Sequence, residues 1–256
     1  LEALRIDLGK PPLEAYFSEI RFALEEVRLA RRNLGKWARP RRAGGGVLNF
    51  PSRCRILPEP RGVAAIIAPW NYPLQLLLAP LASALAAGNC ALLKPSELAP
   101  ASGAALRRLT AACLEPGLVE VLEGGPETTR ALLAQKLDYI FYTGSERVGR
   151  LVMEAAARHL TPLTLELGGK SPCVVDRSAD LALAARRIAW GKFVNAGQTC
   201  VAPDYACVPR ERLAEFADRL RRTIVDFYGP DPAASPDYGR IVNTAQVRPF
   251  HLNKDM

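Results

Sequence analysis

The sequence predicts an α/β fold built on a doubly wound parallel sheet. Two observations lead to this prediction: short apolar runs recur along the chain, the first of them (63–68) wholly apolar, and each is followed by a turn and then by a helical pattern. Wholly apolar runs of this length suit strands that are buried on both faces of a parallel sheet. Strand-turn-helix units in succession favour right-handed crossovers, which cover both faces of the sheet with helices.

The predicted elements follow one another in a regular order. Strands are expected at 63–68, 90–93, 118–122 and 139–142, followed by helices at 74–87, at 101–114, from 124–126 onward and at 147–159. Before them, apolar positions at helical spacing predict one long amphipathic helix over 13–37. Residues 40–60 are rich in Gly, Pro and Arg, and we expect an extended arm or hairpin there. After the fourth unit come strands within 161–170 and at 171–175 and a helix at 181–194.

Composition excludes several classes of protein. The 256 residues are 49% hydrophobic, and no apolar run approaches the roughly 18 residues of a membrane span. The net charge of +8 comes from arginines spread along amphipathic helices, so we expect solvated helix faces and no nucleic-acid site. Six cysteines without a C-x-x-C pair predict no metal site and indicate reduced thiols in a cytoplasmic compartment.

Cys200 is the candidate nucleophile. It lies in the run F-V-N-A-G-Q-T-C-V-A-P of residues 193–203, where small residues and Gly197 allow a substrate carbon to approach the thiol. The alternative is a buried cysteine that packs as a small hydrophobe. A Cys-His dyad with His159 is a further alternative, although a cationic residue at the end of a helix is also an ordinary capping choice.

The turns that follow the strands are the candidate binding site, because ligands of open α/β sheets bind at the carboxyl ends of the strands. Two glycines five apart open a helix at Gly144, Ser145, Glu146, Arg147, Val148 and Gly149, where free N–H groups favour phosphate. The run lacks the G-x-G-x-x-G form, and such glycines also occur for packing alone. Lys94 and Glu97 offer a cation and a carboxylate for ribose hydroxyls; the alternative is a turn lysine with Ser96 as a helix cap.

Glu166 is the candidate acid or base. In the run T-P-L-T-L-E-L-G-G-K of residues 161–170, alternation places three leucines on one face of a strand and Glu166 on the other. A carboxylate among leucines is costly to bury unless its protonation state is used. The alternative is a surface strand with one face in water.

Five motifs in order resemble the aldehyde dehydrogenase superfamily. They are P-W-N-Y-P (69–73), L-K-P-S-E (93–97), F-Y-T-G-S (141–145), L-E-L-G-G-K (165–170) and G-Q-T-C-V-A-P-D-Y (197–205). Finer features, including R-R-I-A-W-G-K-F and D-Y-G-R-I-V-N, are similar to the family 3 branch. The resemblance covers roughly residues 7–244.

The resemblance implies a domain organisation and a class of reaction. An NAD(P)-binding domain is expected over 1–170, with the arm at 40–60 used for oligomerisation, followed by an incomplete catalytic domain over 171–256. Family 3 proteins oxidise medium- and long-chain or aromatic aldehydes to carboxylic acids. The expected cofactor is NAD or NADP, and the expected assembly of the complete form is a homodimer. Glu97 would repel a 2′-phosphate and Lys94 would attract it, so the choice between the cofactors stays open.

The resemblance also implies roles for individual residues. The Cys200 thiolate attacks the aldehyde carbon, and the Asn71 amide and the Cys200 backbone N–H hold the oxyanion. Hydride then leaves for the nicotinamide, and Glu166 activates the water that releases the acid from the thioester. The turn Gly144 to Gly149, together with Lys94 and Glu97, contacts the cofactor.

The sequence departs from the family near its end. Family members continue into an E-I-F-G-P motif that is absent here, and residues after Asn243 drift from the family pattern. We therefore expect a chain truncated at its C-terminus and, since it begins with Leu1, at its N-terminus. The alternative function is an inactive remnant that binds a nucleotide or a partner chain; a thiol-dependent esterase would need only Cys200, Asn71 and Glu166. Membrane association through an absent C-terminus also stays open.

Overall fold

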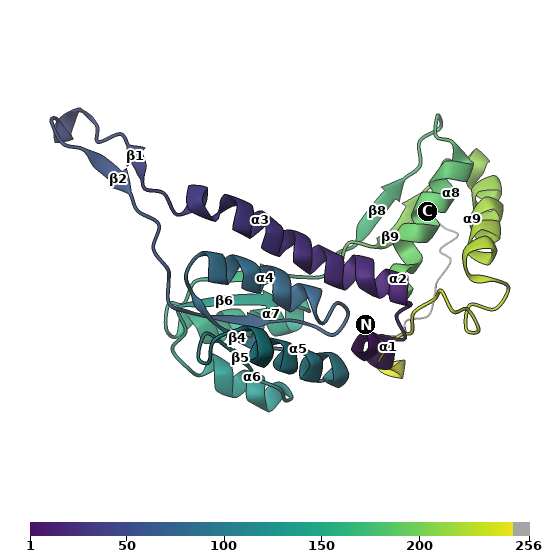
Figure 1. Ribbon diagram of the computed structural model, residues 1–256. Helices are drawn as coiled ribbons and strands as arrows, with labels where there is room; N and C mark the ends of the chain where they lie inside the picture. Colours follow the sequence, from purple (N-terminus) through teal and green to yellow (C-terminus); the bar gives the residue numbers. More distant parts are fainter. Residues whose placement is uncertain (248–256) are drawn as a thin grey trace. The chain divides into compact units, whose positions relative to one another are not determined.

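The computed structural model describes residues 1–247 and contains two compact units (Figure 1). One unit is formed by residues 17–167, and the other combines residues 1–16 with the chain from 168 onward. Residues 248–256, which include His251 and the end of the expected catalytic domain, lie outside the described residues. The functional meaning of the expected domains 1–170 and 171–256 stays a prediction.

A five-stranded parallel sheet is the centre of the 17–167 unit. Its strands are β3 (Val63–Ile67), β4 (Cys90–Lys94), β5 (Val119–Val121), β6 (Tyr139–Thr143) and β7 (Leu163–Glu166), and they lie in the order β5-β4-β3-β6-β7. The doubly wound parallel sheet predicted from the sequence is thereby confirmed. The chain moves outward from β3 to β5 and then returns to the other side of β3, so the strand order reverses between β3 and β6.

Helices cover both faces of this sheet. They are α4 (Gln75–Ala86), α5 (Pro100–Cys113), α6 (Pro126–Leu133) and α7 (Glu146–Ala157). Because the order reverses after β5, right-handed crossovers place α4 and α5 on one face and α6 and α7 on the other. Proline occupies the first turn of α5 and of α6, where the backbone N–H that proline lacks would have no hydrogen-bond partner within the helix.

One core cluster of this unit lies between the sheet and helices α6 and α7. Its buried members are Ala65, Ile67, Leu132, Leu137, Ile140, Tyr142, Val152 and Ala156. The leucines of β7 at 163 and 165, together with Leu167, pack against this cluster, as their alternation with polar residues predicts. Burial of this apolar surface fixes the register of β7 beside β6, and with it the position of the strand end that carries Glu166.

The helix expected over 13–37 is divided by a stretch of wider winding. Helix α2 (Pro12–Ala15) continues into a π-helical segment (Tyr16–Arg21) and then into α3 (Phe22–Trp37). Figure 1 shows α3 lying along α4, outside the sheet. Beyond α3 the chain forms a two-stranded antiparallel hairpin of β1 (Arg41–Ala43) and β2 (Cys54–Ile56), with a 3₁₀ segment (Val47–Asn49) between the strands. The use of this hairpin in oligomerisation stays a prediction.

The second unit is smaller. It contains α1 (Glu2–Leu8), the parallel pair β8 (Ser171–Val174) and β9 (Pro203–Cys207), α8 (Leu181–Phe193), α9 (Leu213–Tyr228) and short 3₁₀ segments at Arg210–Arg212 and Thr244–Gln246. A kinked turn, Val194–Gly197, follows α8. Val175, Leu181, Ala185 and Phe216 form its buried cluster.

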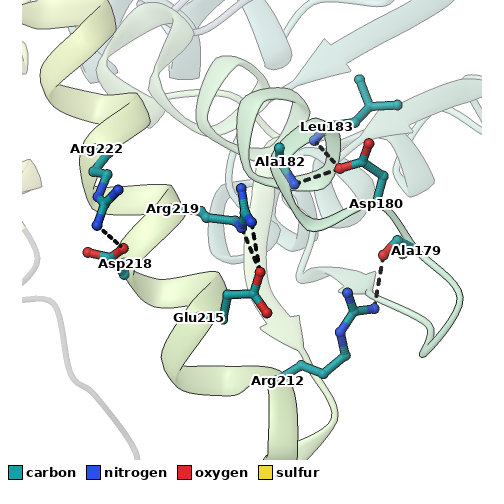
Figure 2. Close-up of polar contacts among 9 residues, drawn as sticks. All are labelled: Ala179, Asp180, Ala182, Leu183, Arg212, Glu215, Asp218, Arg219 and Arg222. Carbon is teal, nitrogen blue, oxygen red and sulfur yellow. Dashed lines mark hydrogen bonds and ion pairs between the residues drawn. The ribbon is translucent and has the colours of Figure 1, made fainter.

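Polar contacts fix the ends of the helices in this unit (Figure 2). The Asp180 carboxylate accepts hydrogen bonds from the N–H groups of Ala182 and Leu183 and thereby caps the N-terminus of α8. Arg212, just before α9, donates to the carbonyl oxygen of Ala179 at 2.9 Å. Along α9, one-turn ion pairs join Arg219 to Glu215 and Arg222 to Asp218. The loop before α8 is thereby tied to the start of α9.

Within residues 1–247, no helix is both long and apolar enough to cross a membrane. All six cysteines are free thiols. Across the same residues, no three His, Cys, Asp or Glu side chains gather in a way that could hold a metal ion.

Two leucines of α5 test the packing of the sheet unit. Leu106 is 1% exposed and Leu109 is 47% exposed, three residues further along the same helix. Leu106→Ala should lower the free energy of unfolding by about 2–5 kcal/mol, because it leaves a cavity. Leu109→Ala should change it by less than about 0.5 kcal/mol. Urea titration followed by circular dichroism measures both, and equal losses in the two variants would contradict the packing described.

Candidate functional site

The carboxyl ends of four neighbouring strands bring most of the predicted site residues to one edge of the sheet. Lys94 ends β4 opposite Ile67 of β3, and Ile67 also lies opposite Tyr142 of β6. Glu166 ends β7 opposite Thr143 of β6. The loop with Asn71 follows β3, and the turn that starts at Gly144 follows β6. Since β3 and β6 flank the reversal of strand order, this edge is the topological switch point where open α/β sheets bind ligands.

A buried carboxylate holds the end of the loop that carries Asn71. Glu19 is fully buried in the π-helical segment, and its Oε2 accepts hydrogen bonds from the N–H groups of Leu74 at 3.0 Å and Gln75 at 2.9 Å. These groups begin α4, so the carboxylate acts as an N-terminal cap and complements the positive end of the helix dipole. Glu19 therefore fixes the loop from which the Asn71 carboxamide projects.

The turn between β6 and α7 has the construction of an anion site. Ser145 caps α7, because its Oγ accepts the N–H of Val148 at 3.4 Å. Gly144 has no room for a side chain, since an added Cβ would lie 2.2 Å from the Tyr142 hydroxyl. The first N–H groups of a helix have no partner within the helix, and the helix dipole adds positive potential there. The exposed part of the turn, Ser145 to Arg147, therefore suits an anionic ligand.

The second glycine of this turn has a packing role. Gly149 is buried on the sheet-facing side of α7, and an added Cβ would lie 3.0 Å from a methyl group of Leu167. Val148 is half-buried and packs against the core cluster. Packing therefore accounts for both glycines, because Leu167 fills the space beside Gly149 and the Tyr142 hydroxyl fills the space beside Gly144. Only Ser145 to Arg147 are exposed on the open side of the turn.

Thr143 adds a polar group at the same edge that the sequence reasoning did not select. Its side chain ends β6, the residue is 8% exposed, and its hydroxyl oxygen has no hydrogen-bond partner among residues 1–247. A buried hydroxyl without a partner is costly. Thr143 could have been selected from the sequence because it lies directly before Gly144 in the F-Y-T-G-S motif.

Lys94 is buried rather than extended over the edge. It is 2% exposed, its Nζ donates to the carbonyl oxygen of Pro95 at 2.7 Å, and the Glu97 carboxylate lies 3.9 Å away. Burial lowers the pKa of Lys94, and the negative charges of Glu97 and Glu127 partly oppose this shift. Glu127 lies in the first turn of α6, after the next strand end, and was not selected from the sequence.

The hydroxyl of Ser96 does not cap a helix. Its Oγ accepts the N–H of Leu98, whereas α5 begins at Pro100 with Ala99 in the capping position. The alternative interpretation of this stretch, a serine cap with an acidic first turn, is therefore wrong in that respect.

Glu166 is exposed at the end of the edge strand β7. Its carbonyl oxygen accepts the Gly144 N–H at 2.9 Å, which joins the end of β7 to the turn before α7. The flanking leucines pack on the other side of the strand. Within the described residues of this unit, the Glu166 side chain therefore faces solvent. Strand β7 thus has one face in water, as the alternative interpretation of this strand expects.

In the second unit, Cys200 lies in a tight turn and is exposed. The N–H of Ala202 donates to the carbonyl oxygen of Thr199 at 3.1 Å and closes the turn around Cys200. Just before it, Asn195, Ala196 and Gly197 all have left-handed backbone, with φ of 56°, 52° and 78°. This conformation costs of order 1–3 kcal/mol for each residue with a Cβ, so the surrounding contacts must impose it.

Two side chains supply these contacts. The Glu14 carboxylate of α2 accepts the Asn195 N–H at 2.9 Å. The Gln198 carboxamide donates to the Asn195 carbonyl oxygen at 2.9 Å and to the Arg240 carbonyl oxygen at 3.0 Å. Glu14 and Gln198 were not among the residues selected from the sequence, because their partners are distant along the chain.

Gly169 approaches the backbone of Cys200 closely. A Cβ added to Gly169 would lie 2.7 Å from the Cys200 carbonyl oxygen, whereas nothing lies within 4 Å of one added to Gly168. The glycine pair of the L-E-L-G-G-K motif is therefore unequal: the Cys200 backbone occupies the space that a side chain at position 169 would need.

The fold and these residues define a class of protein: a doubly wound α/β protein with an exposed helix N-terminus at its switch point and an exposed thiol in a constrained turn. The sequence model of the aldehyde dehydrogenase family matches residues 1–252. The chain belongs to the aldehyde dehydrogenase family, and the resemblance to its family 3 branch is confirmed by the relatives described next.

Several relatives share nearly half of their aligned residues with this chain. It is 47% identical over 243 residues to the 4,4'-diaponeurosporen-aldehyde dehydrogenase of Staphylococcus aureus, a match of 95% of this chain and 53% of the relative. It is 47% identical over 247 residues to the human aldehyde dehydrogenase family 3 member B1, covering 96% of this chain and 53% of the relative. The chain thus spans about half the length of the curated relatives it matches.

Solved structures agree with the fold. The substrate-bound AldH of Staphylococcus aureus superposes with a TM-score of 0.91 at 46% identity, over 94% of this chain and 53% of that chain. A Mycobacterium tuberculosis aldehyde dehydrogenase complexed with NAD+ superposes with a TM-score of 0.84 at 32% identity, over 94% and 50% of the two chains.

Alanine substitutions at Gly169 and Gly168 form a matched pair of variants. Gly169→Ala should lower the free energy of unfolding of the second unit by about 1–3 kcal/mol, because the added methyl group forces the Cys200 backbone to move. Gly168→Ala meets open space and should be neutral or slightly stabilising, by up to about 1 kcal/mol. Denaturant unfolding followed by the fluorescence of Trp190, in α8, measures both. A Gly169→Ala variant as stable as Gly168→Ala would refute the close approach.

The lowered pKa of Lys94 predicts a pH dependence of stability. Between its lowered folded-state pKa and the usual lysine value of about 10.4, the unfolded chain binds more protons than the folded chain, so stability rises with pH. Lys94→Met removes this contribution, and the stability of the unaltered chain relative to this variant should increase as the pH rises toward that value. Urea titrations at several pH values measure the difference, with Lys136→Met, at an exposed lysine, as the control for loss of charge. A relative stability that falls with pH would contradict the burial of Lys94 as a cation.

Proposed function

We propose that this chain carries the cofactor-binding and nucleophile elements of an enzyme that oxidises aldehydes to carboxylic acids with NAD(P)+. The observation that carries the proposal is the arrangement at the switch point: the loop with Asn71 and the turn that starts at Gly144 follow neighbouring strands of a parallel sheet, in a chain of the aldehyde dehydrogenase family. This is the place where such sheets bind dinucleotides.

The residues at this edge fit a dinucleotide. The α7 N-terminus, where Ser145 to Arg147 are exposed, offers N–H groups to a phosphate. The buried Thr143 hydroxyl is a polar atom that a ligand at this edge could satisfy. Lys94 contributes positive charge from below the edge, and Glu97, which is about half exposed, is available to ribose hydroxyls. Bound NAD(P)+ would supply the acceptor for a hydride.

Cys200 is the proposed nucleophile. Its thiolate adds to the aldehyde carbon, and the carbonyl oxygen becomes an oxyanion for which the Asn71 carboxamide and the Cys200 backbone N–H are the assigned donors. Loss of hydride from this carbon leaves a thioester on Cys200. The exposed thiol in a turn of fixed backbone suits this addition, since the N–H and the thiol of one residue are held together.

Glu166 is the proposed base of the second half-reaction. Its carboxylate takes a proton from water, the hydroxide adds to the thioester carbon, and the Cys200 thiolate leaves as the carboxylic acid forms. Its position at the end of β7, joined to Gly144 through the backbone, supports this assignment.

The proposed substrates are apolar aldehydes of medium to long chain or with aromatic groups. Two relatives support this class: one is named for 4,4'-diaponeurosporen-aldehyde, and a solved structure of a Pseudomonas syringae enzyme contains NAD+ and octanal. The choice between NAD+ and NADP+ is left to the assay.

Turnover of the purified chain tests the proposal. The chain is mixed with NAD+ or NADP+ and either benzaldehyde or octanal, and the absorbance of the reduced cofactor is followed. Cys200→Ala should abolish reduction of the cofactor, and Cys113→Ala, at an exposed cysteine of α5, should leave it unchanged. Absence of Cys200-dependent reduction in a folded sample would refute the activity for this chain.

Glu166→Gln separates the two half-reactions. This variant should give a rapid burst of reduced cofactor, about one equivalent per chain, and then stall, because the thioester forms but water is not activated. Quenched-flow absorbance measures the burst, and mass spectrometry detects the acyl group on Cys200. A variant with no burst and no acyl group would contradict the role of Glu166 in deacylation.

A further inference from the structure

The Gln198 carboxamide joins the nucleophile turn to a distant segment of the chain. Its Nε2 donates to the carbonyl oxygens of Asn195, at 2.9 Å, and of Arg240, at 3.0 Å. Its Oε1 accepts the N–H of Val242 at 2.9 Å. Both hydrogens of the amide and its oxygen are therefore used, on partners 3, 42 and 44 residues away in the sequence.

The turn requires such support because its backbone is held in a conformation that the chain does not favour. Three successive residues, Asn195 to Gly197, have positive φ, and two of them carry a Cβ. Asn195 is fully buried, and its side chain donates to the carbonyl oxygen of Gln198 at 3.2 Å. Asn195 and Gln198 thus bond to each other in both directions, with the strained residues between them.

The distant segment is itself anchored. The N–H of Arg240 donates to the carbonyl oxygen of Leu8, at the end of α1, at 2.7 Å. The Arg240 guanidinium donates to the carbonyl oxygens of Ala233 and Tyr238, both at 2.6 Å. Residues 240–242 therefore form a fixed support, against which the side chain of Gln198 can hold the turn.

We propose that Gln198 is a positioning residue for Cys200: its carboxamide clamps the nucleophile turn to residues 240–242 and thereby fixes the direction of the Cys200 backbone N–H. The proposal rests on the proposed function, in which that N–H is a donor to the oxyanion. Only Thr199 separates Gln198 from Cys200, and the Thr199 carbonyl closes the turn, so a rotation of the Gln198 backbone passes directly to the Cys200 N–H.

Amide hydrogen exchange tests the clamp without requiring activity. Gln198→Met keeps the length of the side chain and removes both donors and the acceptor. It should raise the exchange rate at least tenfold both at residues 198–202 and at Val242. Gln135→Met, at an exposed glutamine of the other unit, should change neither region. Unchanged protection of Val242 in Gln198→Met would overturn the clamp.

A second variant, Gln198→Glu, separates the two donated hydrogen bonds of the clamp from the accepted one. It also provides the test if Gln198→Met does not fold. A carboxylate still accepts the Val242 N–H but cannot donate to the carbonyl oxygens of Asn195 and Arg240. Exchange at Val242 should therefore stay within threefold of the unaltered chain, while exchange at residues 199–202 rises at least tenfold. Equal loss of protection at both ends would contradict the assigned hydrogen bonds.

Two reagents test whether the clamp positions the Cys200 N–H. Acetyl transfer from p-nitrophenyl acetate passes through an oxyanion, whereas alkylation by iodoacetamide does not. In Gln198→Met the rate constant of acetylation at Cys200, measured by peptide mass spectrometry, should fall at least tenfold. The rate constant of alkylation at Cys200 should change by less than threefold, and alkylation at Cys113 should not change. An unaltered ratio of acetylation to alkylation would refute the positioning role.

The outcomes distinguish this proposal from the proposed function. If Cys200 of the unaltered chain is not acetylated, its assignment as an acyl-accepting nucleophile fails, and with it the positioning role of Gln198. If it is acetylated and the ratio of acetylation to alkylation does not fall in Gln198→Met, the proposed function stands and the positioning role fails.

Discussion

The reversal of strand order between β3 and β6 is the constraint on which the site in the larger unit depends. Because the sheet is parallel, every strand ends at the same edge, and because the order reverses there, the loops after β3 and β6 diverge to opposite faces. The register of β7 against β6 then brings Glu166 beside the turn at Gly144. This register is set by apolar side chains on the far side of the strand, so the core determines where the polar residues lie.

Much of this arrangement could be predicted from the sequence, since short apolar runs followed by turns reveal a parallel sheet. Gly144 was recognisable because it lies in the turn after such a run, and Glu166 because it alternates with leucines, whereas Asn71 was selected only through the resemblance to the family. Glu19 could not be recognised from the sequence, because its hydrogen-bond partners lie 55 and 56 residues away. The residues around it show only the pattern of a surface helix. The π-helical winding that directs Glu19 inward leaves no periodicity that distinguishes it from an α-helix.

The backbone conformation of the turn before Cys200 could be predicted from the sequence even less. Cys200 could be selected because Gly197 and small residues surround it. The left-handed conformation of Asn195 and Ala196 could not, since neither residue type demands it. It is imposed by Glu14, 181 residues earlier, and by Gln198, acting against residues 240–242. A pattern within a window of a few residues cannot contain contacts of this range.

The hydrogen bond from the Arg240 N–H to the Leu8 carbonyl has a consequence for synthesis of the protein. Residues 17–167 contain a complete sheet with its helices, so this unit can fold while the ribosome is still translating the remainder. Helix α1 cannot complete this contact at that stage, because Arg240 is translated long after Leu8. Closure of so long a loop is slow, and the apolar face of the amino-terminal segment is open to chaperones during that interval.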